Sequence, residues 1–132
     1  MRIFLILLLW LPHLSNAGEY SYSCKVKGEL LSTDAGLITS GNEIYLDSKF
    51  SVERKSGVVL GEDIGNSSYP TKQVIDMGSS DQSYKLIWIS REVIGFEGDY
   101  NSVYLNVEEH NPNLLKPFTL NLGSRTLSGV CN

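Results

Sequence analysis

The sequence contains little histidine and cysteine, the two residue types on which most metal sites and nucleophilic active sites depend. Two histidines and two cysteines occur among 132 residues, and His13 lies in the apolar N-terminal segment. A Ser–His–Asp or Cys–His arrangement would therefore have to be built on His110 alone. His110 lies between Glu109 and Asn111-Pro112, a setting typical of a solvated loop histidine. We expect no catalytic residues, no metal site and no cofactor.

Phosphate-binding and calcium-binding motifs are also missing. The chain contains neither G-x-G-x-x-G nor G-x-x-x-x-G-K-[ST]. Asp99-Tyr100-Asn101 begins like a calcium loop, but Tyr104 and His110 stand where that loop needs glycine and glutamate. Fifteen carboxylates leave a hydrolase that uses a carboxylate pair as an alternative, although no pair stands out.

A hydrophobic run long enough to span a membrane is absent. The longest run covers nine residues, Ile3 to Leu11, and as a helix it would span about 14 Å, roughly half of a bilayer core. Arg2 precedes it, Pro12 ends it, and Ser15-Asn16-Ala17 follows, which is the pattern of a cleaved signal peptide. The sequence predicts a signal peptide at 1–17 and a single domain at 18–132. We expect export to the periplasm or the medium, without a membrane anchor.

Positive charge is scarce and scattered. The chain has eleven basic and fifteen acidic residues and a net charge of −4. Removal of Arg2 with the signal peptide leaves ten against fifteen, a net charge of −5. The only adjacent basic pair in the predicted domain is Arg54-Lys55. Nucleic acid and anionic membrane surfaces are therefore poor partners for this protein.

Helical periodicity is missing from the predicted domain, whereas two-residue alternation recurs. It is strictest at 20–27, where Tyr20, Tyr22, Cys24 and Val26 share one side. Similar segments occur at 50–55, 58–60, 74–77, 83–90, 103–108, 118–122 and 126–131. Short strands joined by turns predict an all-β fold, a small antiparallel meander closed as a barrel, with a β-sandwich as the alternative.

The two cysteines extend this prediction. Cys24 lies on the apolar side of the first predicted strand and Cys131 ends the last one. In an exported protein such a pair favours a disulfide. The bond would close a loop of about 107 residues and stabilise the fold by about 4.7 kcal/mol. It also requires the first and last strands to be neighbours, which favours the barrel because closure removes exposed sheet edges.

Aromatic residues fall into two groups. Tyr20, Tyr22, Tyr84 and Trp88 lie in predicted strands and are expected in the core. The segment 84–89 is apolar on both faces, which predicts a central strand covered on both sides.

The second group lies in predicted loops and comprises Tyr69, Phe96 and Tyr100, together with the polar residues Asp99 and Asn101. These residues form a candidate binding rim. Packing of the loops against one end of the barrel is the alternative. The segment Asn66-Ser67-Ser68 has the form of an N-glycosylation acceptor.

The signal peptide, Tyr22-Ser23-Cys24, the hairpin at 50–57 and the closing Gly-Val-Cys-Asn at 129–132 resemble small exported proteins of Gram-negative bacteria with no assigned function. The cysteine arrangement is also similar to that of the periplasmic C-type lysozyme inhibitors. The inhibitory Ser-Gly-x-x-Tyr motif of that family is absent, and the segment from Ser79 to Tyr84 only partly echoes it. No residue role is transferred.

From these observations we expect an exported, non-enzymatic binding or interaction domain with a small molecule or a protein as its partner. Inhibition of a cell-wall lytic enzyme is the alternative within the same class. A hydrolase with a carboxylate pair is the alternative from a different class.

Overall fold

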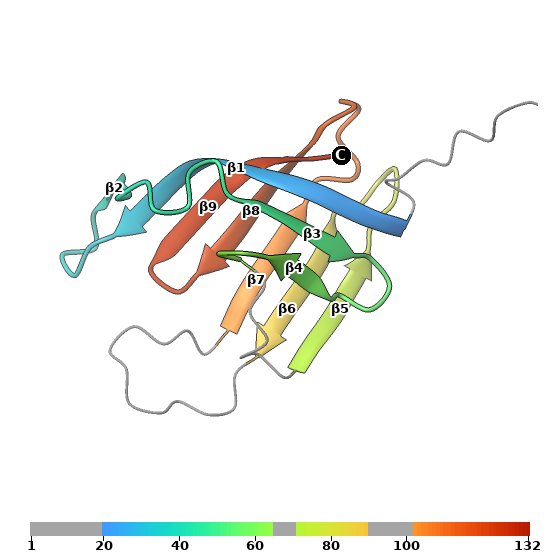
Figure 1. Cartoon of the computed structure of the whole chain (residues 1–132), viewed down its shortest axis with the longest axis horizontal. Helices are drawn as coiled ribbons and strands as arrows, with labels where there is room; N and C mark the ends of the chain where they lie inside the picture. Colours follow the sequence, from blue (N-terminus) through green and yellow to red (C-terminus); the bar gives the residue numbers. More distant parts are fainter. Residues whose placement is uncertain (1–19, 65–70, 90–101) are drawn as a thin grey trace, which may run out of the picture.

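The computed structural model describes residues 20–64, 71–89 and 102–132. These residues form nine antiparallel strands (Figure 1). Their bounds are β1 (Ser21–Ser32), β2 (Ile38–Ser40), β3 (Lys49–Glu53), β4 (Val59–Gly61), β5 (Thr71–Met77), β6 (Tyr84–Ile89), β7 (Ser102–Val107), β8 (Lys116–Leu122) and β9 (Arg125–Cys131). The all-β prediction is therefore confirmed.

The strands build one sheet in the order β4-β3-β1-β9-β8-β7-β6-β5, with β2 paired to the far end of β1. This sheet curls into an open half-barrel, because no backbone pairing joins β4 to β5 within the described residues. The predicted closed barrel is wrong, and so is its sandwich alternative. The prediction took adjacent terminal strands as a sign of closure. In fact β1 and β9 are neighbours inside the sheet, and the two edges come from the middle of the chain.

The length of β1 explains this topology. Over residues 21–25 it pairs with β3, and over residues 30–32 it pairs with β2, while β9 lies along its other side. A β-bulge between Val26 and Gly28 interrupts the register with β9. Because a bulge shifts side-chain alternation by one residue, Glu29 is buried opposite Leu127. The predicted first strand ended too early, at Lys27, and did not include β2.

The concave face of the sheet carries the apolar core. Side chains that alternate along the strands, such as Val52, Leu86, Leu105 and Leu120, are buried there. Two aromatic contacts cross from one wall to the other. The Tyr22 and Tyr84 rings lie 5.2 Å apart edge-to-face, and the Phe50 and Phe118 rings lie 5.3 Å apart. Such pairs contribute about 0.5–1.5 kcal/mol beyond their burial.

Three of the four aromatic residues predicted for the core lie in it. Tyr22, Tyr84 and Trp88 are buried, whereas Tyr20 is 71% exposed because it precedes the first paired residue of β1. The prediction that β6 is covered on both faces is wrong for the outer face. Ile87 is only partly buried, since the described residues form one curled sheet without a second layer behind it.

The turn between β3 and β4 packs against the opposite wall of the half-barrel. Gly57 in this turn has φ of 71°, in the left-handed region that favours glycine. A Cβ at this position would lie 2.5 Å from Leu86, so glycine is needed for space as well as for conformation. The described part of the chain contains no helix that is long and apolar enough to cross a membrane.

Candidate functional site

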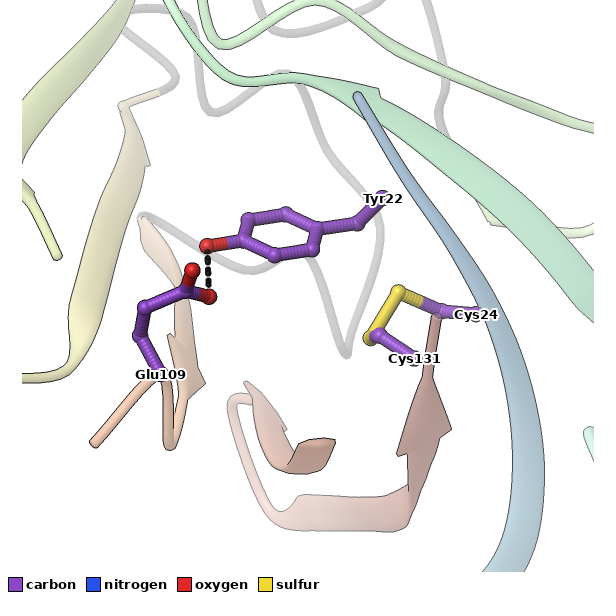
Figure 2. Close-up of a disulfide and its surroundings, with 4 residues drawn as sticks. All are labelled: Tyr22, Cys24, Glu109 and Cys131. Carbon is purple, nitrogen blue, oxygen red and sulfur yellow. Dashed lines mark hydrogen bonds between the residues drawn. A yellow bond between two sulfur atoms is a disulfide. The ribbon is translucent and has the colours of Figure 1, made fainter. Parts of the chain in front are cut away.

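The predicted disulfide is present. Cys24 in β1 and Cys131 in β9 are directly opposite each other, with an S–S distance of 2.05 Å and a Cα–Cα distance of 4.0 Å (Figure 2). Both residues are buried in the core. This bond fixes β1 to β9 at the end of the sheet where Tyr22 reaches Glu109.

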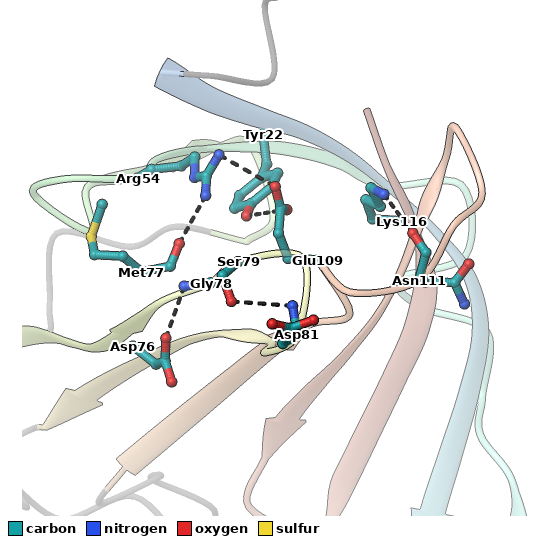
Figure 3. A network of polar contacts seen from close by, with 10 residues as sticks. All are labelled: Tyr22, Arg54, Asp76, Met77, Gly78, Ser79, Asp81, Glu109, Asn111 and Lys116. Carbon is teal, nitrogen blue, oxygen red and sulfur yellow. Dashed lines mark hydrogen bonds and ion pairs between the residues drawn. The ribbon is translucent and has the colours of Figure 1, made fainter.

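A polar network connects the two walls of the half-barrel at the same end (Figure 3). Arg54 directly follows β3, and one guanidinium nitrogen lies 3.4 Å from the Glu109 carboxylate. A second guanidinium nitrogen donates to the Met77 carbonyl oxygen at the end of β5, at 2.8 Å. The Tyr84 hydroxyl donates in turn to the Arg54 carbonyl oxygen at 3.0 Å. Arg54 therefore connects β3 to three segments of the opposite wall.

Tyr22 of β1 also belongs to this network. Its hydroxyl donates to the Glu109 carboxylate at 2.6 Å, and the Arg54 guanidinium lies 5.0 Å from the centre of its ring. Burial, together with this hydrogen bond, raises the pKa of Tyr22 well above its usual value. Burial likewise raises the pKa of Tyr84 to about 12. Both phenols are held in the neutral form, so the network is suited to stabilise the wall and not to transfer protons at neutral pH.

The sequence did not predict this network because its members are far apart in the chain. Tyr22 and Glu109 are separated by 87 positions. Two local signals were present: Arg54-Lys55 is the only adjacent basic pair in the predicted domain, and Glu109 directly follows another glutamate, Glu108. Neither signal indicates that Arg54 and Glu109 lie close together in space. Their contact depends on the way the sheet folds.

His110 is exposed, as predicted, and has one polar partner among the described residues. Its Nδ1 lies 3.3 Å from the Ser83 hydroxyl oxygen. In a serine-nucleophile triad the imidazole contacts serine through Nε2, while a carboxylate orients Nδ1. The present contact uses Nδ1 for the serine, so the two residues do not reproduce that arrangement.

The outer face carries a hollow of about 590 Å³ between residues 44–49 and 61–63. Ile44 and Leu46 line it although they are 60% and 39% exposed. Lys49, Glu62 and Asp63 supply charged groups around this apolar lining. The volume lies within the range of about 300–1,000 Å³ typical of ligand sites.

The turn at residues 43–47, held by side-chain contacts, shapes this hollow. Glu43 and Asp47 have φ of 59° and 64°, the left-handed region that few non-glycine residues adopt. Lys25 holds the Asp47 carboxylate at 2.7 Å and lowers its pKa by this hydrogen bond and by its charge. The Ser48 hydroxyl donates to the Asp63 carboxylate at 3.0 Å, which connects the two sides of the hollow. Residues 44–47 form a turn. Ile44 and Leu46 line the hollow, whereas Tyr45 packs against the core.

A smaller hollow of about 230 Å³ adjoins the first one. Lys49 lines both hollows. Leu115 from the β7–β8 loop and Val130 from β9 line the smaller hollow, together with Ser23 of β1. Sequence patterning did not predict these surfaces, because a hollow on an outer face depends on how loops pack beside strands.

The residues of the predicted binding rim, Tyr69, Phe96, Asp99, Tyr100 and Asn101, lie outside the described residues. Asn66, the candidate glycosylation site, also lies outside them.

No protein-family model matches this chain, and no curated protein or solved structure matches it significantly.

Proposed function

We propose that this protein is an exported, non-enzymatic binding domain that holds a ligand or a segment of a partner protein in the 590 Å³ hollow on its outer face. The observation that carries the proposal is the combination of exposed Ile44 and Leu46 with charged Lys49, Glu62 and Asp63 in one hollow of ligand size. Binding sites combine apolar contact area with a few polar groups that fix orientation.

The carboxylates of this hollow support binding over hydrolysis. A general acid needs a carboxyl group with a raised pKa. The pKa of Asp47 is lowered by Lys25, so this group stays ionised. Asp63 already accepts a hydrogen bond from Ser48. These contacts favour carboxylates that orient a ligand, and the hydrolase remains the less favoured alternative.

The proposal is tested by screening the purified protein by NMR against a library of small molecules and short peptides. Binders should shift the amide signals of residues 44–49 and 61–63 together. Ile44→Ser should weaken the binding at least tenfold, whereas Leu37→Ser, at an equally exposed apolar residue outside the hollow, should not change it. A screen whose binders all shift signals elsewhere would refute this location.

Inhibition of a cell-wall lytic enzyme is a second candidate function. It is favoured by the charge of the hollow, because Glu62 and Asp63 face the single lining cation Lys49, while the third lining carboxylate, Asp47, is paired with Lys25. Such a surface is complementary to a basic partner, and complementary charge speeds association. A stable complex with a C-type lysozyme on gel filtration, lost in Glu62→Lys and kept in Asp81→Lys, would support this function. Migration of the two proteins as separate species would argue against it.

A further inference from the structure

The outer face of the sheet carries uncharged polar side chains where three of its middle strands, β7, β8 and β9, lie side by side (Figure 1). The residues that alternate with the buried core positions of these strands point to this face. The described residues place no second layer over it. Register arranges six of its polar residues in two adjacent rows, which together form the β7–β9 patch: Tyr104 with Asn121 and Thr126, and Asn106 with Thr119 and Ser128.

Two asparagines of the patch occupy positions that strand propensity does not favour. Asn106 and Asn121 lie in two central strands, although asparagine is depleted in strands because its side chain competes for backbone hydrogen bonds. Both are partly exposed, and Tyr104 is two residues from Asn106 and directly opposite Asn121. An aromatic ring and two amides therefore lie within reach of one small ligand.

The polar groups of the patch are available to a ligand. The Thr126 hydroxyl donates to the Asn121 side-chain oxygen at 2.9 Å, which leaves both N–H groups of that amide as donors. Within the described part of the chain, the side chains of Asn106, Thr119 and Ser128 make no hydrogen bond or ion pair. Each of these three side chains can both donate and accept a hydrogen bond.

This composition matches a sugar better than a charged ligand. Sugar hydroxyl groups donate and accept hydrogen bonds, as the amides and hydroxyls of the patch do, and the C–H groups on one side of a sugar ring pack against an aromatic ring such as that of Tyr104. The two rows contain no charged side chain. At their edge Lys85 of β6 lies beside Asn106 and opposite Asp76 of β5. An ionised ligand over the two rows would lose water without gaining a partner of opposite charge.

We propose that the β7–β9 patch binds a neutral oligosaccharide, with Tyr104 packed against one sugar ring and Asn106 and Asn121 hydrogen-bonded to its hydroxyl groups. Three strands at a spacing of about 4.8 Å span about 10 Å, so hydroxyl groups of more than one sugar unit reach the two rows. This site goes beyond the proposed ligand hollow, because no residue of the patch lines that hollow. Either site can bind its ligand without the other.

An NMR titration of the purified protein with three neutral hexasaccharides tests the proposal: maltohexaose, cellohexaose and the hexamer of N-acetylglucosamine. The surface is open and the contacts are few, so we expect at least one of them to bind with a Kd of ~1 mM. Binding should shift the backbone amide signals of residues 104–106, 119–121 and 126–128 and the side-chain amide signals of Asn106 and Asn121. The signals of residues 44–49 and 61–63 should stay in place. A hexamer of galacturonic acid, which carries a carboxylate on each unit, should bind at least fivefold more weakly.

Tyr104→Ala should weaken this binding at least fivefold because it removes the ring, and Asn106→Asp should do the same because it adds a charge at nearly constant size. Tyr20→Ala and Asn113→Ala are the matched controls, since both residues are exposed and lie outside the patch; neither should change the Kd. Circular dichroism shows whether each variant keeps the fold. If Tyr104→Ala unfolds, Tyr104→Leu replaces it, since leucine keeps apolar bulk in the strand and removes the ring.

The proposal would be overturned if none of the three neutral sugars shifted the signals of the patch at ~10 mM. Equal binding of the galacturonic acid hexamer, or folded variants of the patch that bind as tightly as the wild type, would overturn it too. Sugars that shift only the signals of residues 44–49 and 61–63 would support the ligand hollow and overturn the patch. The two sites can therefore fail independently.

Discussion

The terminal strands and the edge strands bring the walls of this half-barrel together by different means. β1 and β9 are joined by a backbone ladder, with one β-bulge between Val26 and Gly28, and by the Cys24–Cys131 disulfide. β4 and β5 share no ladder in the described residues, and the contacts of Arg54 join their walls at one end. A strand ladder fixes the register along its whole length, whereas a side-chain network fixes a single point. The open side should therefore be the weaker and more adaptable part of the domain.

Each side also contains an ion pair that is at least partly buried, and these two pairs, Arg125–Glu29 and Arg54–Glu109, differ in burial. On the closed side, Arg125 of β9 contacts Glu29 of β1, whose side chain has no exposed surface. On the open side, the Arg54 and Glu109 side chains are 14% and 20% exposed. Water can therefore reach the Glu109 carboxylate and not that of Glu29, whereas the two arginines are similarly exposed, at 14% for Arg54 and 17% for Arg125. Breaking the closed pair should be the more costly change, since an uncompensated buried charge is strongly unfavourable.

The largest effect is expected from removing the disulfide on the closed side. In Cys24→Ala/Cys131→Ala, a loop of 107 residues is released, and the free energy of unfolding should fall by about 4.7 kcal/mol. By the usual relation this lowers the melting temperature by roughly 15 °C or more. Thermal unfolding measured by circular dichroism checks this expectation. A variant that melts within a few degrees of the wild type would show that the β1–β9 ladder alone suffices.

Trp88→Ala should destabilise the β6–β7 wall nearly as much. Trp88 is 3% exposed and pairs across the strands with Val103, and truncating a buried aromatic residue costs about 3–5 kcal/mol. Urea unfolding measures this loss, with Lys85→Ala on the outer side of the same strand as the control. In the predicted mature form Trp88 is the only tryptophan. Its emission should be blue and resistant to soluble quenchers, and red, readily quenched emission would contradict its place in the core.

The strands and the disulfide were predictable because they leave local signals. Alternation placed Tyr22, Cys24 and Val26 on one side of the first strand, and all three are buried. The curvature and the open side were not predictable, because they depend on which strands pair across long loops. The bulge near Gly28 illustrates the limit: it turns Glu29 inward, and nothing in a charged residue within an alternating strand predicts that it is buried.

The candidate binding surfaces depended even more on tertiary structure. The predicted rim rested on loop aromatics, whereas both hollows lie on the outer face and share Lys49. Residues 44–49 and 61–63 become neighbours because β3 and β4 form a hairpin beside the 43–47 turn. The sequences of residues 44–49 and 61–63 show no hydrophobic periodicity and no known binding motif. Only the fold reveals that apolar and charged side chains gather there.

The two ion pairs allow a direct test of the comparison. Arg125→Met leaves Glu29 charged in a fully buried position and should cost about 3–5 kcal/mol. Arg54→Met leaves Glu109 partly hydrated and should cost about 1–3 kcal/mol. Urea unfolding of both variants gives the order. Adding Glu29→Gln to Arg125→Met should restore part of the loss, and an equal or greater loss for Arg54→Met would reverse the expected ranking.

The smallest effect at neutral pH is expected for Tyr22→Phe on the open side. The substitution keeps the ring against Tyr84 and removes only the hydroxyl that donates to Glu109. The lost hydrogen bond should lower the free energy of unfolding by about 1 kcal/mol. Urea unfolding at pH 7 measures the difference, and Tyr104→Phe, on a partly exposed tyrosine of β7, is the control.

Alkaline pH should then reduce or reverse this difference. Below the ordinary tyrosine pKa of about 10, both the folded and the unfolded states keep the proton, so the phenol adds no pH dependence. Burial raises the pKa of Tyr22 in the folded state, so between about pH 10 and 12 the unfolded state releases a proton that the folded state retains, and stability falls. Tyr22→Phe lacks this proton and keeps the equivalent effect of Tyr84. Its stability should therefore fall less steeply over this pH range than that of the wild type. Parallel curves for the two proteins would mean that Tyr22 ionises as readily in the folded state as in the unfolded one.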